Sequence, residues 1–283
     1  MRKVSFGMPI SPSWNAWRIE ADQATRDQQF EHGKKVNITD HYRDKRCKQE
    51  IARAFYGKCA FCESRILHVD VEERVEPQTQ YSHVEHFRPK GRVRDRNDQV
   101  VRYNHNNEKY DHPGYYWLAY NWRNLTLACE ICNSMCKSDR FPIEGNYMLD
   151  PEQDISKLDE YEKPLLINPI DDLYDPHEHF EFNRENGFLI ALSEKAKMCN
   201  RIFQLNQRGL PEARMQVYIQ TRLHFKMALD CRFTGHPDPF IESFIRRSRE
   251  GKEPFTFAAL WAIQDAESEL LSGIRSIGTG SMH

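Results

Sequence analysis

Two pairs of cysteines have the spacing that metal sites use. Cys59 and Cys62 form one Cys-x-x-Cys pair, and Cys129 and Cys132 form a second. Each pair can supply half of a tetrahedron of thiolates, the ligand set that suits Zn²⁺ at about 2.3 Å. Because four sulfur ligands leave no open position for a substrate, we predict a structural zinc site. Buried thiols or redox pairs are the alternative, and Cys136 is a less favoured substitute ligand.

A second set of residues could hydrolyse a phosphodiester. Glu85 offers a carboxylate oxygen and Asn133 an amide oxygen, a sparse donor set that suits Mg²⁺ or Mn²⁺. His86 has an ordinary pKa of about 6.5, so it could take the proton of an attacking water near neutral pH. We therefore predict that Glu85 and Asn133 bind a catalytic ion and that His86 is the general base. Singly, each has a simpler interpretation as a surface residue or a helix cap.

Three neighbours extend this set. Lys137 follows Asn133 by four residues, so a helix would place both on one face, where Lys137 could contact phosphate. A solvated lysine is the alternative. Asn124 can cap a turn, so from the residues alone its role is more structural than chemical. His83 shares a strand face with Glu85 and either orients it or is simply part-buried.

A basic run adjoins the predicted site. It contains Arg88, Lys90, Arg92, Arg94, Arg96 and Arg102, with Tyr103, Tyr110, Tyr115 and Tyr116 nearby. Cations interleaved with aromatic rings suit a nucleic-acid backbone and stacked bases, whereas solvated loop charge is the alternative. We predict contacts to nucleic acid from Arg88, Lys90, Arg92, Arg94 and Lys137.

These motifs resemble the HNH endonuclease family. That family's pattern runs from a cysteine pair through an acidic-His dipeptide and an Asn-Leu to Cys-x-x-Cys followed by His or Asn. The sequence resembles the PtuB-like branch, found in bacterial anti-phage systems of the Septu and retron-associated types, at residues 58–63, 85–90, 133–137 and 140–142. Residues 166–169 and 179–182 are also similar, so the resemblance covers roughly residues 40–230.

The resemblance implies specific roles. In the family the first His is the general base, the middle Asn orients its loop and the last His or Asn binds the metal, roles that fall on His86, Asn124 and Asn133. This sequence has Glu85 where Asp is frequent and Asn133 where His is frequent, which shifts the expected ion towards Mg²⁺ or Mn²⁺. The branch also implies a PtuA-like ATPase partner of the ABC or SMC type. No residue here shows that partner, and the sequence contains no Gly-x-x-x-x-Gly-Lys-Ser/Thr loop of its own.

Composition narrows the class of protein. The 283 residues are 39% hydrophobic and 29% charged, which is typical of a folded protein with a polar surface. A net charge of −2 attracts phosphate only weakly, so nucleic acid must be bound by local basic patches. We find no run of about 18 apolar residues and no signal-peptide pattern, and therefore expect a cytoplasmic protein without a membrane partner.

The chain divides into three predicted parts of an α+β fold. Residues 1–58 form an N-terminal helical segment, with a helix from residue 40 onward. Residues 59–142 form a small zinc-pinned ββα-metal (HNH) unit, with strands at 81–87 and 124–128, a polar loop at 88–112 and a helix after Cys132. Residues 143–283 form the C-terminal region.

That C-terminal region begins with an acidic, proline-punctuated stretch at residues 150–175, which is typical of a linker or a wrapping segment. A hairpin over residues 179–190 follows. Helices are predicted from Ser193 to residue 205, from Pro211 towards residue 232, and over residues 255–274.

The sequence thus predicts a metal-dependent HNH endonuclease that cuts nucleic acid, with DNA favoured over RNA, as the nuclease subunit of a defence complex. A catalytically silent, zinc-stabilised adaptor or nucleic-acid-binding protein is the alternative. Only the joint presence of Glu85, His86 and Asn133 argues against it.

Overall fold

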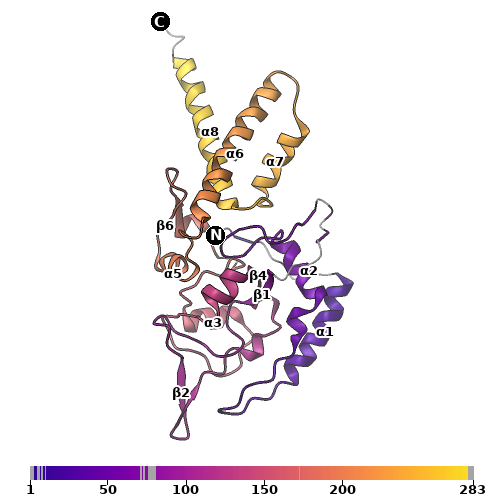
Figure 1. The fold of residues 1–283 in the computed structure, drawn as a ribbon, viewed down its shortest axis with the longest axis vertical. Coiled ribbons are helices and arrows are strands. Elements are labelled where there is room, and N and C mark those ends of the chain that lie inside the picture. The colour runs from indigo at the N-terminus through magenta and orange to yellow at the C-terminus, as the bar shows by residue number, and fades with distance from the viewer. Residues whose placement is uncertain are drawn as a thin grey trace.

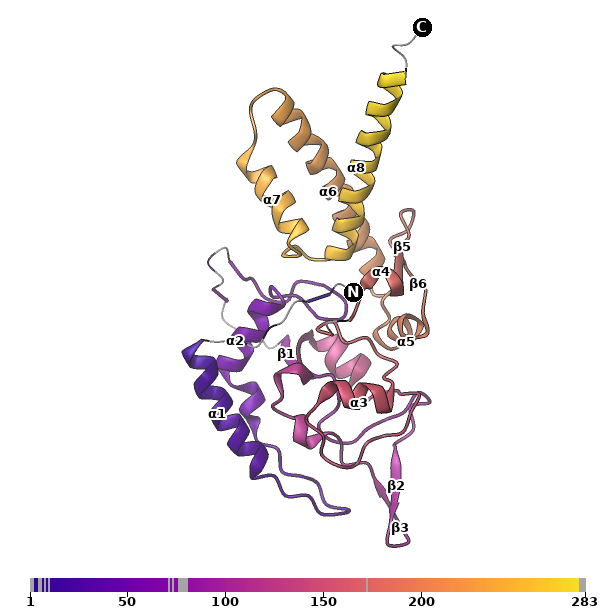
Figure 2. The same cartoon turned by 180° about the vertical axis from the view of Figure 1, so that it is seen from behind.

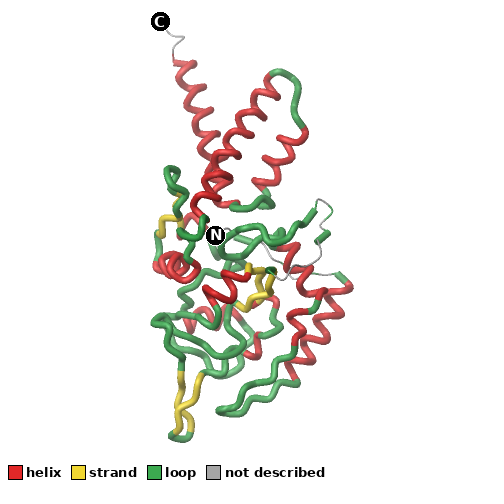
Figure 3. Tube along the Cα trace, viewed as in Figure 1, coloured by secondary structure: helices red, strands yellow, loops and turns green. Residues whose placement is uncertain are grey.

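A computed structural model describes residues 3–4, 7, 9, 11–70, 72, 74–75, 81–171 and 173–279, with side chains of the last helix described to residue 272. It combines helices with three two-stranded antiparallel sheets, the α+β composition that was predicted. Figure 1 shows an elongated molecule in which α6, α7 and α8 extend from one end of the remaining chain. The tube of Figure 3 shows how much of the body between the helices is loop.

The N-terminal segment contains two helices joined by an extended stretch. Helix α1 (Pro12–Arg26) begins where the Ser11 side chain accepts a hydrogen bond from the amide of Trp14. The helix predicted from residue 40 is divided into a 3₁₀ turn η1 (Asp40–Arg43) and α2 (Lys45–Ala54), because Asp44 caps a new helix. Helix α1 itself was not predicted. Residues 28–39, between α1 and η1, are called the strap below.

The predicted strand, strand, helix order is present. Strand β1 (Ser82–His86) pairs antiparallel with β4 (Leu125–Cys129), and Glu85 lies opposite Thr126 in the register. After β4 the chain enters η4 (Ile131–Lys137), which is a π-helix. Because the pairing is antiparallel, η4 begins beside the start of β1. It then runs back along β1, so that Asn133 contacts His83 and Lys137 contacts Glu85.

The insertion between β1 and β4 is more ordered than predicted. Strands β2 (Arg102–His105) and β3 (Glu108–Asp111) form a hairpin inside the stretch predicted as loop. Asn106 and Asn107 both have positive φ, at 50° and 66°, as a type I′ turn requires. The 3₁₀ turns η2 (Tyr116–Leu118) and η3 (Trp122–Asn124) lead into β4.

The stretch predicted as a linker or a wrapping segment contains a helix that was not predicted, and it packs into the core as a linker would not. Helix α3 (Ile155–Glu162) begins where the Asp154 side chain accepts from the amide of Ser156. Leu158 and Glu162 on this helix are fully buried, so α3 packs into the interior of the protein.

The C-terminal region follows the predictions closely. The short helix α4 (Pro176–His179) precedes a hairpin of β5 (Phe180–Phe182) and β6 (Leu189–Ala191). Ser193 caps α5 (Glu194–Phe203) as predicted, and α6 (Leu210–Phe233) and α8 (Thr256–Thr279) match the other two predicted helices. Helix α7 (Pro239–Arg249) was missed, although Asp238 is its cap and Pro239 its first residue.

One main core connects all three parts of the chain. It includes Trp14 near the N-terminus, Phe61 beside the cysteines and Phe257 in α8. Phe61 stacks on Phe203 of α5 with 4.1 Å between ring centroids. A smaller apolar cluster, which includes Phe225, lies between α6, α7 and α8, the projecting helices in Figure 2.

The turn before α8 is attached to the first cysteine pair. Lys58 is buried, and its ammonium donates to the Thr256 hydroxyl at 2.6 Å and to the carbonyl of Glu253 at 2.9 Å. The amide of Phe257 donates to the carboxylate of Glu63 at 3.3 Å. The projecting helices are therefore anchored on the segment that carries Cys59 and Cys62.

Within the described residues, none of the helices combines the length and the apolar character that crossing a bilayer requires.

Candidate metal and catalytic site

The four predicted cysteine ligands converge. The sulfur atoms of Cys59, Cys62, Cys129 and Cys132 all lie within 4.8 Å of one another, and those of Cys62 and Cys129 are 3.9 Å apart. A tetrahedron of zinc–sulfur bonds of about 2.3 Å has edges of about 3.8 Å, so these cysteines fit a zinc ion. Cys136 is buried but outside this cluster, which agrees with its interpretation as a small apolar residue.

The surroundings of the cluster also suit thiolates. The Arg208 guanidinium donates to Cys132 Sγ at 3.6 Å, and the Cys132 amide donates to Cys129 Sγ at 3.4 Å. The amide of Ala60 donates to the carbonyl of Leu127 in β4. The first cysteine pair is thus fastened to the strand that leads into the second pair.

Glu85, His86 and Asn133 line one groove. It has a volume of about 1240 Å³ and is bounded by the strap, the segment after β1, the β2–β3 hairpin and the start of η4. Glu85 and His86 come from the end of β1, and they are only 6% and 4% exposed, so they lie at the floor of the groove. The three predicted groups therefore border a common space.

His86 is held in one orientation. Its Nε2 lies 2.9 Å from the carbonyl oxygen of Ala119, which can only accept, so Nε2 carries the proton and Nδ1 keeps a free lone pair. The ring also packs edge-on against Tyr42 at 4.8 Å. Burial, followed by the charge of Lys90, holds the pKa of His86 well below its ordinary value. The imidazole is therefore neutral at physiological pH and able to accept a proton.

Lys137 departs from the prediction. Its side chain is fully buried, and its ammonium donates to Glu85 Oε1 at 2.7 Å and to the carbonyl of His86 at 2.8 Å. It has no exposed surface for a phosphate, so the predicted nucleic-acid contact is corrected to a positioning role. Burial raises the pKa of Glu85, and the Lys137 charge opposes that rise. Lys137 thus favours the ionised form of Glu85 and holds the carboxylate in place.

Asn133 is positioned by His83. The Asn133 side-chain nitrogen lies 2.8 Å from His83 Nδ1, which fixes the amide and leaves its oxygen as a donor for an ion. His83 lies on β1 two residues before Glu85, as its predicted orienting role requires, but the residue it contacts is Asn133. One carboxylate oxygen of Glu85 is occupied by Lys137, so the second oxygen and the Asn133 oxygen form a donor set that fits Mg²⁺ or Mn²⁺.

Asn124 clips the loop that follows His86. It is fully buried, its Oδ1 accepts from the amide of Arg88 at 2.7 Å, and its Nδ2 donates to the carbonyls of Arg88 and Leu118. The amide of Phe87 donates to the backbone carbonyl of Asn124 as well. Asn124 contributes no surface to the groove, and its contacts are those of a structural residue.

The predicted basic run divides into two kinds of residue. Arg88 is fully buried and pairs with Glu162 at 3.0 Å and Asp159 at 2.6 Å, both on α3, so its predicted contact with nucleic acid is wrong. Arg94 pairs with Asp98 and Asp139 and does not border the groove.

Lys90 and Arg92 do line the groove. The Lys90 ammonium lies 4.3 Å from the centre of the Tyr42 ring, and Arg92 is half exposed beside Asp139. For these two residues, contact with phosphate therefore stays a prediction.

The strap and the hairpin contribute cations that were not predicted. Lys34 and Lys35 from the strap and Lys109 from the hairpin also line the groove. The Asn106-Asn107 pair, whose residue type tolerates positive φ, was the sequence signal that could have placed Lys109 on a hairpin. No local signal places the strap, whose position depends on tertiary contacts.

Comparison with known proteins identifies two relatives. The Septu protein PtuB of Bacillus mycoides (strain KBAB4) is 34% identical over 193 residues, which is 67% of this chain and 56% of that protein. The Septu protein PtuA of the same organism is 29% identical over 168 residues, which is 59% of this chain and 20% of that protein. The chain thus spans little more than half the length of PtuB and a fifth of PtuA. No protein-family model and no solved structure matches the chain. By sequence similarity the chain is therefore a PtuB-like relative of the Septu proteins, as its motifs predicted.

Proposed function

We propose that the chain is a metal-dependent HNH endonuclease that hydrolyses phosphodiester bonds of nucleic acid. The observation that carries this proposal is the common groove of Glu85, His86 and Asn133 at the end of a two-stranded sheet, beside four clustered cysteines. A base, a carboxylate and a carboxamide around one cavity are what hydrolysis of a phosphodiester needs.

His86 acts as the general base. Its Nδ1 accepts a proton from water, the water oxygen attacks phosphorus, and the bond from phosphorus to the leaving oxygen breaks. The hydrogen bond to Ala119 holds the ring in the tautomer that this step requires. Because the ring is neutral, it can accept this proton, and it passes the proton to the departing oxygen or to solvent before the next turnover.

Glu85 and Asn133 would hold a divalent ion, Mg²⁺ or Mn²⁺. Such an ion, when bound, relieves the negative charge that develops on the phosphate. Lys137 and His83 fix these two ligands, and Asn124 fixes the loop that carries the base. Zinc in the cysteine cluster would be structural, since four sulfurs fill its coordination sphere.

The proposal extends to the biological setting. Relatedness to PtuB supports a role in an anti-phage complex of the Septu type, with a PtuA-like ATPase as partner. The sequence has no phosphate-binding Gly-x-x-x-x-Gly-Lys-Ser/Thr loop, so nucleotide hydrolysis falls to that partner. DNA is the favoured substrate, with RNA as the second choice.

The test is cleavage by the zinc-loaded full chain, alone and with a PtuA-type ATPase, with Mg²⁺ or Mn²⁺ added. Wild type is compared with His86→Ala, and His236→Ala serves as the control because His236 is exposed in the turn between α6 and α7. We expect the control to cut DNA like wild type and His86→Ala to lose at least about 100-fold in rate. Equal cutting by wild type and His86→Ala refutes the assignment, and no cutting by any protein supports the adaptor alternative.

A further inference from the structure

The groove over the catalytic residues is closed on one side by contacts between the strap and the hairpin. The ring of His32 in the strap stacks on His105 of β2, with 3.5 Å between centroids and 12° between planes. His32 Nδ1 also lies 2.9 Å from the hydroxyl of Tyr103. While these contacts hold, nothing passes between strap and hairpin at this point. We call His32, Tyr103 and His105 the clasp.

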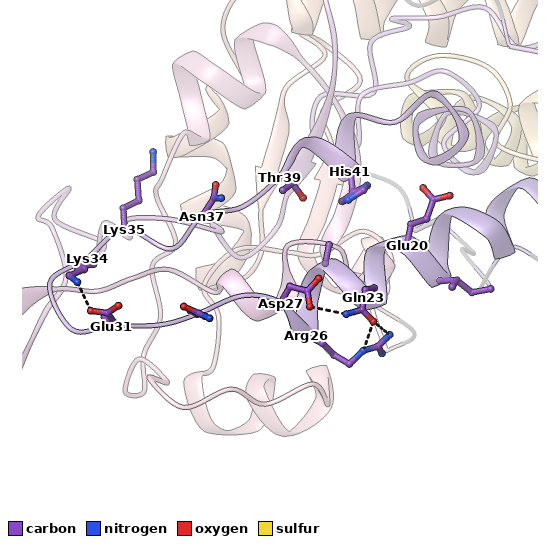
Figure 4. Close-up of a pocket in the computed structure, with 13 residues that line it drawn as sticks. Glu20, Gln23, Arg26, Asp27, Glu31, Lys34, Lys35, Asn37, Thr39 and His41 are labelled. Atoms are coloured by element: carbon purple, nitrogen blue, oxygen red, sulfur yellow. Dashed lines mark hydrogen bonds and ion pairs between the residues drawn. The ribbon is translucent and has the colours of Figure 1, made fainter.

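Two further contacts hold the strap down. Phe30 stacks on Tyr116, with 5.5 Å between centroids and 16° between planes. Gly33 has a φ of 76° and approaches Tyr110 so closely that a Cβ there would meet its ring at 2.8 Å. On its other side the strap borders a separate cavity of about 830 Å³ against α1, where Figure 4 shows Gln23 hydrogen-bonded to Asp27 and Arg26. The strap is therefore a wall between two spaces.

Among the described residues, lysine side chains without an ion-pair partner line the groove, whereas its carboxylates are all paired. Each carboxylate that lines it has a basic partner: Glu85 pairs with Lys137, Asp111 with Arg102, and Asp139 with Arg92 and Arg94. Within the described part of the chain, no carboxylate lies within 4.0 Å of the ammonium groups of Lys35, Lys90 and Lys109, which also line the groove. Three uncompensated cations from three separate segments thus surround it, an arrangement that attracts a polyanion.

Aromatic rings lie among these cations. Tyr103 and Tyr110 are opposite each other in the β2–β3 register, with 5.9 Å between ring centroids, and both border the groove. Tyr42 borders it beside Lys90. Rings interleaved with phosphate-binding cations are the usual platform for unpaired bases, which stack on any aromatic face.

The burial of the floor and the volume of the groove favour a single strand over a duplex. The scissile phosphate must reach Glu85 and His86, which are nearly buried at the floor, between walls joined by the clasp. A volume of about 1240 Å³ accommodates a few nucleotides of one strand and not the full cross-section of a double helix. Paired bases would also be unable to stack on Tyr103 and Tyr110.

We propose that the groove binds an unpaired, single-stranded segment of nucleic acid, with Lys35 and Lys109 on its backbone phosphates and bases stacked on Tyr103 and Tyr110. This inference rests on the proposed nuclease function and narrows its substrate to single strands or unpaired loops. The shared chemistry is a flexible phosphodiester chain with exposed bases, which single-stranded DNA and RNA both offer.

The test is fluorescence anisotropy with the zinc-loaded full chain and no added Mg²⁺ or Mn²⁺. The probes are a single-stranded DNA of about 12 nucleotides, the RNA of the same sequence and the blunt DNA duplex. We expect at least one single strand to bind about tenfold more tightly than the duplex, and the tighter of the two single strands identifies the sugar. Duplex binding that is as tight or tighter overturns the inference.

Variants locate the bound strand. A plot of log K against log salt has a negative slope. In Lys35→Gln/Lys109→Gln we expect this slope to become shallower by about 1.4, since each single-strand phosphate contact contributes about 0.7. The matched control is Lys157→Gln/Lys197→Gln, whose lysines are 69% and 62% exposed and lie outside the groove. The inference is overturned if the slope becomes no shallower in the groove variant than in the control.

A second pair tests stacking. Tyr110→Leu weakens single-strand binding by about fivefold or more, whereas Tyr110→Phe, which keeps the ring, retains it. Equal binding by the two contradicts stacking on this ring. Failure of the two proposals is distinguishable: equal cutting by wild type and His86→Ala removes the nuclease function, whereas His86-dependent cutting with preferred duplex binding removes only the single-strand inference.

Discussion

Replacing Lys137 by methionine tests how the Glu85 carboxylate is held. Methionine is similar in length and apolar, so it fills the space of the lysine stem and removes its charge. In the folded protein the Lys137 side chain is fully buried and that of Glu85 is 8% exposed. The substitution therefore leaves a buried carboxylate without its cation.

The expected loss follows from that burial. Breaking a buried ion pair by removing one partner costs about 3–5 kcal/mol of unfolding free energy, because the remaining charge is desolvated without compensation. At roughly 2 °C per kcal/mol for a chain of this size, the melting temperature falls by about 6–10 °C. Removing both charges in Lys137→Met/Glu85→Leu should recover most of the loss, since no unpaired charge then remains.

Urea unfolding of the zinc-loaded proteins measures these differences. Lys157→Met is the control, because Lys157 is 69% exposed, and it should stay within about 0.5 kcal/mol of wild type. The reasoning is refuted if Lys137→Met loses less than about 1 kcal/mol, or if the double variant is no more stable than the single one. Lys137→Met should also leave the salt dependence of nucleic-acid binding unchanged, in contrast to a residue that contacts phosphate.

Three further predictions concern the scaffold. Cys59→Ser or Cys129→Ser should lower both the bound zinc, measured by elemental analysis, and the melting temperature, and retention of a full equivalent of zinc in both variants would reject the site. Asn124→Ala should lose at least about 2 kcal/mol in urea unfolding, because the three backbone groups it contacts become unsatisfied, and a loss under about 0.5 kcal/mol would contradict that role. Burial lowers the pKa of His112 from 6.5 to about 4, so the unfolded chain binds the proton more readily and stability falls as pH drops from 6.5 towards 4. Between pH 7 and 5 His112 should account for about 2 kcal/mol of that fall, and an equal fall in His112→Gln would contradict this assignment.

The sequence predicted those features that local spacing encodes. The two Cys-x-x-Cys pairs predicted the sulfur cluster, because the spacing within a pair already sets half of the ligand geometry. Ser193 and Pro211 marked the starts of α5 and α6, since caps and first-turn prolines act within a few residues. The groups at Glu85, His86 and Asn133 could be brought together only through the pattern of a known family, and the structure places them on one groove.

The wrong predictions concern contacts between distant segments. Arg88 was assigned to nucleic acid from its place in a basic run, but Glu162 and Asp159, more than 70 residues away, bury and neutralise it. Lys137 was predicted to contact phosphate on the basis of α-helical spacing. However, η4 is a π-helix, and the Lys137 ammonium points towards Glu85. A local sequence pattern could not predict these ion-pair partners, because burial depends on which elements pack together.

The anchoring of α8 on the cysteine segment limits how this protein can be divided. A fragment trimmed to residues 59–142 would lose Phe203, the ring on which Phe61 stacks. Extending it back to Lys58 would add a buried ammonium whose acceptors, at Glu253 and Thr256, were gone. Residues 59–142 are therefore not an independent module. Transplanting them into another protein requires that the loop before α8 travel with them, because a change in either segment disturbs the other.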